Sequence, residues 1–295
     1  MSATEVEREH LSATALRQLM TCPLQYRLQR IDGVPPSHRS PSLVLGGVYH
    51  GTLATALLSV MDDKDVTVKQ MVEWFEDGWA AQVKLAEPPI KWSKKITEDN
   101  LRELGRALVE AWHAQALPIF MEAESIIAVE LAFSVPIFNS DGEVLRMPID
   151  GYIDCVYRTT DGKVVVVDHK TASQKFGDAA IETEIQPTIY AHAVRFLGID
   201  DDPVFHYHVM SKAKKPKLTV VEVPRGEGDS DRLDWICGQA DRLISSGIYL
   251  PTAPDWKCES CEYAHACRRA HAEIVVPDEV AVPAERPSPE PVAVA

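Results

Sequence analysis

Residues 148–170 read PIDGYIDCVYRTTDGKVVVVDHK, and this stretch decides the fold. Two apolar runs flank the pair Asp161-Gly162, which is a strong signal for a hairpin turn between two strands. The second run contains four consecutive valines, a pattern typical of a strand that is buried on both faces. Asp168 and Lys170 follow these valines two positions apart, so they point to the same face where the strand leaves the core.

Asp154, Asp168 and Lys170 form the candidate catalytic group. Because the turn folds the two strands together, the two carboxylates lie on neighbouring strands with an ammonium beside them. Such a pair suits a hard divalent cation such as Mg²⁺ or Mn²⁺. The cation polarises a phosphodiester and activates a bound water, which the lysine orients. An Asp-x-Lys triplet also occurs by chance, so its place at the end of a valine-rich strand is what favours catalysis.

Other polar residues accompany this group. Gln186 and Tyr190 are four positions apart on a predicted helix and share one of its faces, although Tyr190 alone also fits a core aromatic. His50 lies on a predicted helix, where a lone histidine is more often structural than a ligand. Glu130 alternates with apolar strand residues and fits both an inward carboxylate and an exposed one. His169 points away from the aspartates, and we expect it to be structural.

Three cysteines lie close together with a spacing that suits a metal site: Cys258, Cys261 and Cys267. The fourth ligand must come from elsewhere. Cys22, at the end of the first predicted helix, is the better candidate and His265 the weaker one. Cys155 and Cys237 are expected to be small buried hydrophobes. Four thiolates fit both zinc and an iron–sulfur cluster, so the spacing leaves the metal open.

The remaining periodicity indicates an α/β fold. Ser12 is expected to cap a first helix that buries Ala15, Leu16, Leu19 and Met20. Helical segments surround a run of strands, which indicates a mixed sheet with helices packed on it. The expected helices cover 12–20, 43–61, 72–79, 101–112, 181–197 and 233–246, and the expected strands cover 127–133, 144–146, 151–157, 163–169, 204–210 and 218–223.

Composition limits the class of protein. The 295 residues carry a net charge of −14, which argues against a general polyanion-binding protein coated in lysine. The polar, acidic first ten residues do not resemble a signal peptide, and no stretch approaches the roughly 20 apolar residues of a membrane span. We therefore expect a cytoplasmic protein with reduced cysteines and no membrane partner. Lysines gather at 91–95 and 212–217, which fits both solvated loops and a nucleic-acid path.

Together these residues resemble the RecB-like branch of the PD-(D/E)XK nuclease superfamily, in particular the compact iron–sulfur exonucleases associated with CRISPR adaptation and their phage relatives. The resemblance runs from Ser12 to Cys267. Its pieces occur in the family's order: Ser12, Leu16, Cys22-Pro23 and Tyr26, then His50, Gly151-x-x-Asp154, Asp168-x-Lys170, Gln186-x-x-x-Tyr190, and Cys258, Cys261 and Cys267.

The resemblance implies a restriction-endonuclease-like mixed sheet flanked by helices. It implies that Asp154, Asp168 and His50 bind Mg²⁺ or Mn²⁺ and that Lys170 serves the attacking water. It implies that Gln186 and Tyr190 support the site or the DNA. It further implies that the four cysteines 22, 258, 261 and 267 hold a 4Fe-4S cluster, with Zn²⁺ as the other possible occupant.

On this basis the chain divides into five parts: an arm (1–10), a mainly helical part with Cys22 and His50 (11–125), the nuclease core (126–250), a cluster-binding segment (251–271) and an acidic, proline-rich tail predicted to be disordered (272–295). The implied function is a metal-dependent exonuclease on single-stranded or free-ended DNA. Recombination, replication or CRISPR-adaptation proteins are the implied partners. Two alternatives stay open: a non-catalytic DNA-end-binding subunit, and a structural zinc protein.

Overall fold

A computed structural model describes residues 10–139, 141–173, 178–253 and 256–272. The predicted acidic tail and N-terminal arm lie almost wholly outside these residues. The centre is a five-stranded sheet in the order β1-β2-β3-β4-β5. The strands are β1 (Ser125–Val135), β2 (Ile149–Arg158), β3 (Val164–Ala172), β4 (Val204–Ser211) and β5 (Leu218–Glu222). Only β3 and β4 pair in parallel, so the sheet is mixed, as the sequence predicts.

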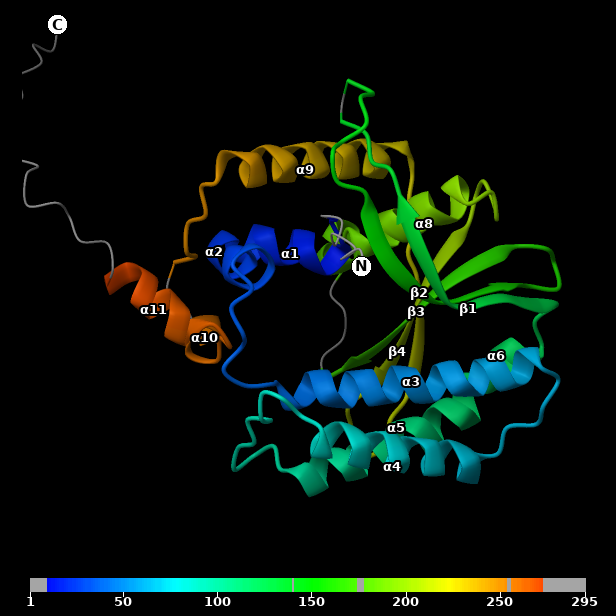
Figure 1. The fold of residues 1–295 in the computed structure, drawn as a ribbon. Helices are drawn as coiled ribbons and strands as arrows, with labels where there is room; N and C mark the ends of the chain where they lie inside the picture. The colour runs from blue at the N-terminus through cyan, green and yellow to red at the C-terminus, as the bar shows by residue number, and fades with distance from the viewer. Residues whose placement is uncertain (1–9, 140, 174–177, 254–255, 273–295) are drawn as a thin grey trace, which may run out of the picture.

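Helices cover both faces of the sheet (Figure 1). One layer contains α3 (Pro41–Met61), α4 (Val68–Lys84), α5 (Glu98–Gln115) and α6 (Leu117–Met121). The other contains α1 (Ala13–Thr21), α8 (Gln186–Phe196) and α9 (Glu227–Ser246), with α7 (Asp178–Thr183) leading into α8. Four short helical segments lie to one side: α2 (Pro23–Tyr26), the π-helix Arg27–Ile31, α10 (Trp256–Glu259) and α11 (Ala264–Ala272).

The valine run of β3 joins the two cores. Val164 and Val166 pack in the core shared with α1, α8 and α9, whereas Val165 and Val167 pack in the core under α3–α6. All four valines are buried, as expected for a central strand with helices on both faces. The charged end of β3 is therefore held by two packed layers.

Local signals explain several helix boundaries. The Ser12 hydroxyl accepts a hydrogen bond from the Ala15 N–H at 3.1 Å, which caps α1 as predicted. Thr67 and Gln70 form a reciprocal capping box at the start of α4. Gly247 adopts a positive φ of 68° and ends α9. These contacts fix the ends of the helices that cover the sheet.

Three expectations about elements were wrong. Met20 is 55% exposed, although Ala15, Leu16 and Leu19 are buried as predicted. Residues 144–146 form no strand and contribute only the isolated bridge of Val144 with Phe138. The expected helix over 181–197 is divided into α7 and α8. Pro187 explains this division, since its ring clashes with the carbonyl of the preceding turn of a continuous helix.

Helix α3 departs from the expected absence of long apolar segments. It is 21 residues long and contains an 18-residue window with a mean hydropathy of 1.5, so by length and composition it is apolar enough to cross a membrane. In the fold it is a core helix. Its side chains Leu45, Tyr49 and Leu53 are buried against the other helices of its layer.

Candidate active site

The site forms where β2 and β3 separate. Their ladder ends at the pair Cys155–Val167. Asp154 directly precedes Cys155 on β2, and Asp168 directly follows Val167 on β3, so both lie just beyond the last pair. The Asp154 carboxylate accepts a hydrogen bond from the backbone N–H of His169 at 2.7 Å. This carboxylate takes the place of the backbone carbonyl that a continued β2–β3 ladder would offer. Asp168 is only 2% exposed. The geometry thus holds two carboxylates side by side at the divergence of two central strands.

Lys170 and Gln186 hold the Asp168 carboxylate. The Lys170 Nζ lies 2.7 Å from Asp168 Oδ2 and donates a hydrogen bond to Gln186 Oε1 at 3.0 Å. The Gln186 amide nitrogen donates to Asp168 Oδ1 at 2.7 Å. Asp168 Oδ2 is therefore held by the ammonium and Asp168 Oδ1 by the amide, so both oxygens of this buried carboxylate have a partner.

Tyr190 anchors this arrangement to the sheet. Its hydroxyl accepts a hydrogen bond from the Gln186 amide at 2.8 Å and donates one to the Tyr152 carbonyl at 2.7 Å. Its ring packs against Phe133 in the core. Tyr190 is therefore a core aromatic and also fixes the position of Gln186, so the two interpretations of this residue are compatible.

His50 reaches the site from α3. Its Nδ1 lies 3.3 Å from Asp154 Oδ1, and about a third of its side chain is exposed. Burial lowers the pKa of His50, but the hydrogen bond and charge of Asp154 outweigh burial, so the pKa is raised. The same contacts outweigh the burial of Asp154 and lower the pKa of that carboxyl. His50 and Asp154 thus behave as a pair.

The electrostatics of Asp168 suit a cation. Burial, assisted by the charge of Asp154, raises the pKa of Asp168 to about 6 in spite of the opposing effect of Lys170. A divalent cation beside both aspartates would favour their charged forms, and two carboxylates with an imidazole are a donor set that Mg²⁺ or Mn²⁺ accepts. Among the described residues no three His, Cys, Asp or Glu side chains already form a metal cage.

His169 lies on the opposite side of β3, as expected. Its ring packs edge-on against Trp112, and both ring nitrogens lack hydrogen bonds within the described ranges. Burial lowers the pKa of His169 to about 4, so the ring is neutral at physiological pH. It is a core residue of the layer under α3–α6.

The four candidate cluster cysteines lie in one region of the fold, although no three side chains within the described ranges are already arranged to hold a metal ion. Cys22, Cys261 and Cys267 pack on one small apolar cluster built around Leu24 and Tyr263. Burial raises the pKa of Cys261, and the neighbouring Cys22 and Cys258 raise it further. Thiols of this kind are the donors that zinc and iron–sulfur clusters use.

The other two cysteines lie elsewhere. Cys155 and Cys237 are fully buried in the two main cores, as the sequence predicts. The weaker candidate ligand, His265, lies on α11 with Cys267 but is not among the groups that shift the pKa of Cys261 or Cys267. All six cysteines are free thiols.

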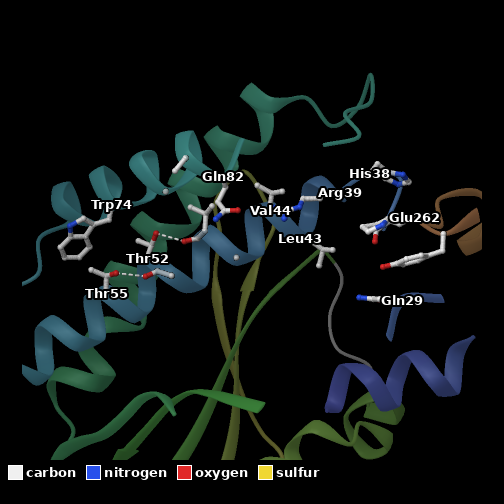
Figure 2. Close-up of a pocket in the computed structure, with 17 residues that line it drawn as sticks. Gln29, His38, Arg39, Leu43, Val44, Thr52, Thr55, Trp74, Gln82 and Glu262 are labelled. Atoms are coloured by element: carbon white, nitrogen blue, oxygen red, sulfur yellow. Dashed lines mark hydrogen bonds between the residues drawn. The ribbon is translucent and has the colours of Figure 1, made fainter. Parts of the chain in front are cut away.

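Two open cavities flank α3. One, of about 660 Å³, lies between α3 and α4 and is lined by residues such as Gly51, Thr55 and Trp74 (Figure 2). It includes neither aspartate of the site. The second, of about 550 Å³, is lined by Cys22, Cys258 and Cys261 together with Lys91 and Trp92. The lysine-rich segment 91–95 thus borders the cysteine segment.

Comparisons with known proteins give the family, one relative and a similar fold. The model of the PD-(D/E)XK nuclease superfamily matches residues 10–268. The Gene 69 protein of Mycobacterium phage D29 is 22% identical over 281 residues, which cover 90% of this chain and 98% of the phage protein. The crystal structure of a proposed exonuclease from Eubacterium rectale is similar with a TM-score of 0.55 and 11% identity, covering 88% of this chain and 93% of that one.

Proposed function

The chain belongs to the PD-(D/E)XK nuclease superfamily, and we propose that it is a Mg²⁺- or Mn²⁺-dependent deoxyribonuclease that hydrolyses DNA from its ends. The observation that carries the proposal is the contact network of Asp168, Lys170 and Gln186 beside Asp154. A buried acid pair with a fixed ammonium is suited to phosphodiester hydrolysis. The structural likeness to a proposed exonuclease supports the preference for ends.

Each residue has a distinct task in this mechanism. Asp154, Asp168 and His50 would hold the cation, which supplies Lewis acidity and an activated water when bound. Lys170 orients the attacking water and stabilises negative charge that develops on the phosphate. Gln186 fixes both Asp168 and Lys170, and Tyr190 fixes Gln186.

We also propose that Cys22, Cys258, Cys261 and Cys267 bind a 4Fe-4S cluster and that the chain belongs to the RecB-like branch. The grouping of the four thiols supports a metal at this place, and Zn²⁺ is the competing occupant. The test is anaerobic purification followed by absorption spectroscopy and iron and sulfide analysis. A brown protein with stoichiometric iron supports the cluster, whereas a colourless protein that contains zinc contradicts it.

We propose that the protein acts in the cytoplasm on single-stranded or free-ended DNA. Its proposed partners are recombination, replication or CRISPR-adaptation proteins. The second candidate function, a non-catalytic DNA-end-binding subunit, has no feature in its favour because the candidate catalytic residues are all in place. The test is digestion of end-labelled linear DNA, single- and double-stranded, beside covalently closed circles. Cleavage of linear DNA alone, dependent on Mg²⁺ or Mn²⁺ and abolished by chelator, is expected.

A further inference from the structure

A lysine-rich turn lies at the edge of the sheet where β3 ends. Strand β4 runs parallel to β3, and their last pair is Ala172–Ser211, so both strands end at this edge. The turn between β4 and β5, residues 212–217, follows directly, and the Lys212 N–H donates a hydrogen bond to the Ala172 carbonyl at 2.8 Å. Lys170 precedes Ala172 by two residues on β3, roughly 7 Å along a strand. The turn therefore begins close to the lysine of the candidate active site.

Hydrogen bonds hold the backbone of this turn in place. The Gln115 side chain, at the end of α5, donates to the Pro216 carbonyl at 3.2 Å and accepts from the Leu218 N–H at 3.0 Å. Across the turn, the Ser211 N–H donates to the Lys217 carbonyl at 3.0 Å, and the Ser211 hydroxyl accepts from the Lys217 N–H at 2.9 Å. Because the backbone is already ordered, a ligand of this turn pays little for ordering it.

The turn gathers positive charge without acidic partners. In a chain with a net charge of −14, residues 212–217 contain no acid and four lysines: Lys212, Lys214, Lys215 and Lys217. None of the four forms an ion pair within the described part of the chain, whereas the exposed Lys64 and Lys69 pair with Asp62 and Glu73. Burial lowers the pKa of Lys212, and no acid among the described residues opposes this effect. Like charges held this close favour a ligand with several negative charges.

We propose that the turn at 212–217 binds the phosphodiester backbone of the DNA strand held in the active site, next to the nucleotide that is cleaved. This assignment rests on the proposed nuclease function and adds a contact outside the catalytic group. Lysine ammoniums bind phosphates as point charges, and such contacts position a strand without reading its sequence. The acidic chain as a whole repels DNA, so a local cationic turn attracts the strand to this edge of the sheet.

The test measures DNA binding without cleavage. The parent protein is the full chain with Asp168→Asn, and a labelled single-stranded oligonucleotide is titrated with it in Mg²⁺ at several salt concentrations, with fluorescence anisotropy as the readout. The turn variant adds Lys214→Gln and Lys215→Gln, two exposed lysines of the turn. The matched control adds Lys64→Gln and Lys69→Gln, which remove the same charge from exposed, acid-paired lysines. All three proteins should have the same thermal midpoint, because only exposed side chains differ between them.

The turn variant should bind DNA more weakly than its parent at low salt. Its plot of log affinity against log salt concentration should be less steep by roughly 1.4, since each phosphate contact with a single strand contributes about 0.7. The control should keep the slope of the parent. An unchanged slope in the turn variant would overturn the assignment, as would an equal change in the control, which would show that only total charge matters. No DNA binding by the parent together with no cleavage by the wild type would instead remove the proposed nuclease function.

Discussion

At the scale of single residues, the site depends on a few side chains whose positions are fixed by others. Asp168 and Lys170 come from one strand, and Gln186 from α8 joins them. The sequence predicts the shared face of the first two from their spacing alone. It does not predict the contact of Gln186 with both, because that contact depends on how α8 packs on the sheet.

Lys170→Ala should leave the proposed metal ligands in place and remove the group that orients the water. The loss of such electrostatic assistance costs roughly a hundredfold to a thousandfold in rate. DNA affinity should change little, since phosphate contacts elsewhere supply most of it. Single-turnover cleavage and a gel-shift titration measure the two quantities. Lys163→Ala, on the exposed turn of the same hairpin, serves as the control and should retain full activity.

Tyr190→Phe should separate the structural and positioning roles of this residue. The ring and its packing remain, but the hydrogen bonds to the Tyr152 carbonyl and the Gln186 amide are lost. We expect a loss of about 1–2 kcal/mol in the free energy of unfolding and a lower cleavage rate. Tyr157→Phe, in the core under α3–α6 and without a hydrogen-bonded hydroxyl in the described structure, should change neither. Equal urea midpoints for wild type and Tyr190→Phe would contradict this account.

At the scale of elements, hydrophobic periodicity predicts the long helices and the five strands of the sheet, but not the short helical segments α2, Arg27–Ile31, α6, α10 and α11. Pro187 divides the segment after β3 into two helices. The left-handed backbone of Glu130, with a φ of 49° within β1, was not predictable, because a positive φ in a glutamate leaves no pattern in the sequence. The apolar residues of β1 alternate in the sequence as in a regular strand, and both cores accept apolar side chains, so the pattern gives no sign of this backbone irregularity.

The crossing of α3, α4 and α5 depends on a glycine. A Cβ at Gly105 would fall on the ring of Phe75 and 2.9 Å from Leu45 Cδ1. Gly105→Ala should therefore overpack the crossing and lower the free energy of unfolding by about 1–3 kcal/mol. Gly238→Ala is the matched control, because a Cβ there meets only ordinary contact at 3.9 Å and the substitution favours the helix α9. Urea unfolding of the two variants gives the comparison, and equal stabilities would count against tight packing.

At the scale of the whole molecule, the cysteine segment joins the two ends of the folded chain. Cys22 follows α1, and the other three cysteines follow α9, more than two hundred residues later. The sequence predicts this partnership, and Cys22, Cys261 and Cys267 pack on one apolar cluster in the structure. The identity of the metal does not follow from either, because zinc and iron–sulfur clusters use the same thiolates.

Cys22→Ala should lose the bound cluster and destabilise the whole fold. Closing so long a loop restricts the unfolded chain by several kcal/mol, on the order estimated for long disulfide loops. The measurements are iron and sulfide content and the thermal midpoint. Cys155→Ala and Cys237→Ala, which change buried cysteines far from the cluster, should keep full iron content. Wild-type iron in Cys22→Ala would exclude this residue as a ligand.

We propose that this fold cleaves DNA with the carboxylates of Asp154 and Asp168, where β2 and β3 separate. The most direct test is cleavage of end-labelled DNA in Mg²⁺ or Mn²⁺ by the wild type and by Asp168→Asn, each purified in the same way and shown to have the same thermal midpoint. The asparagine preserves the size of the side chain and the hydrogen bond from Gln186, but it removes the charge. We predict cleavage by the wild type and none by Asp168→Asn. Equal cleavage by the two proteins would contradict the account.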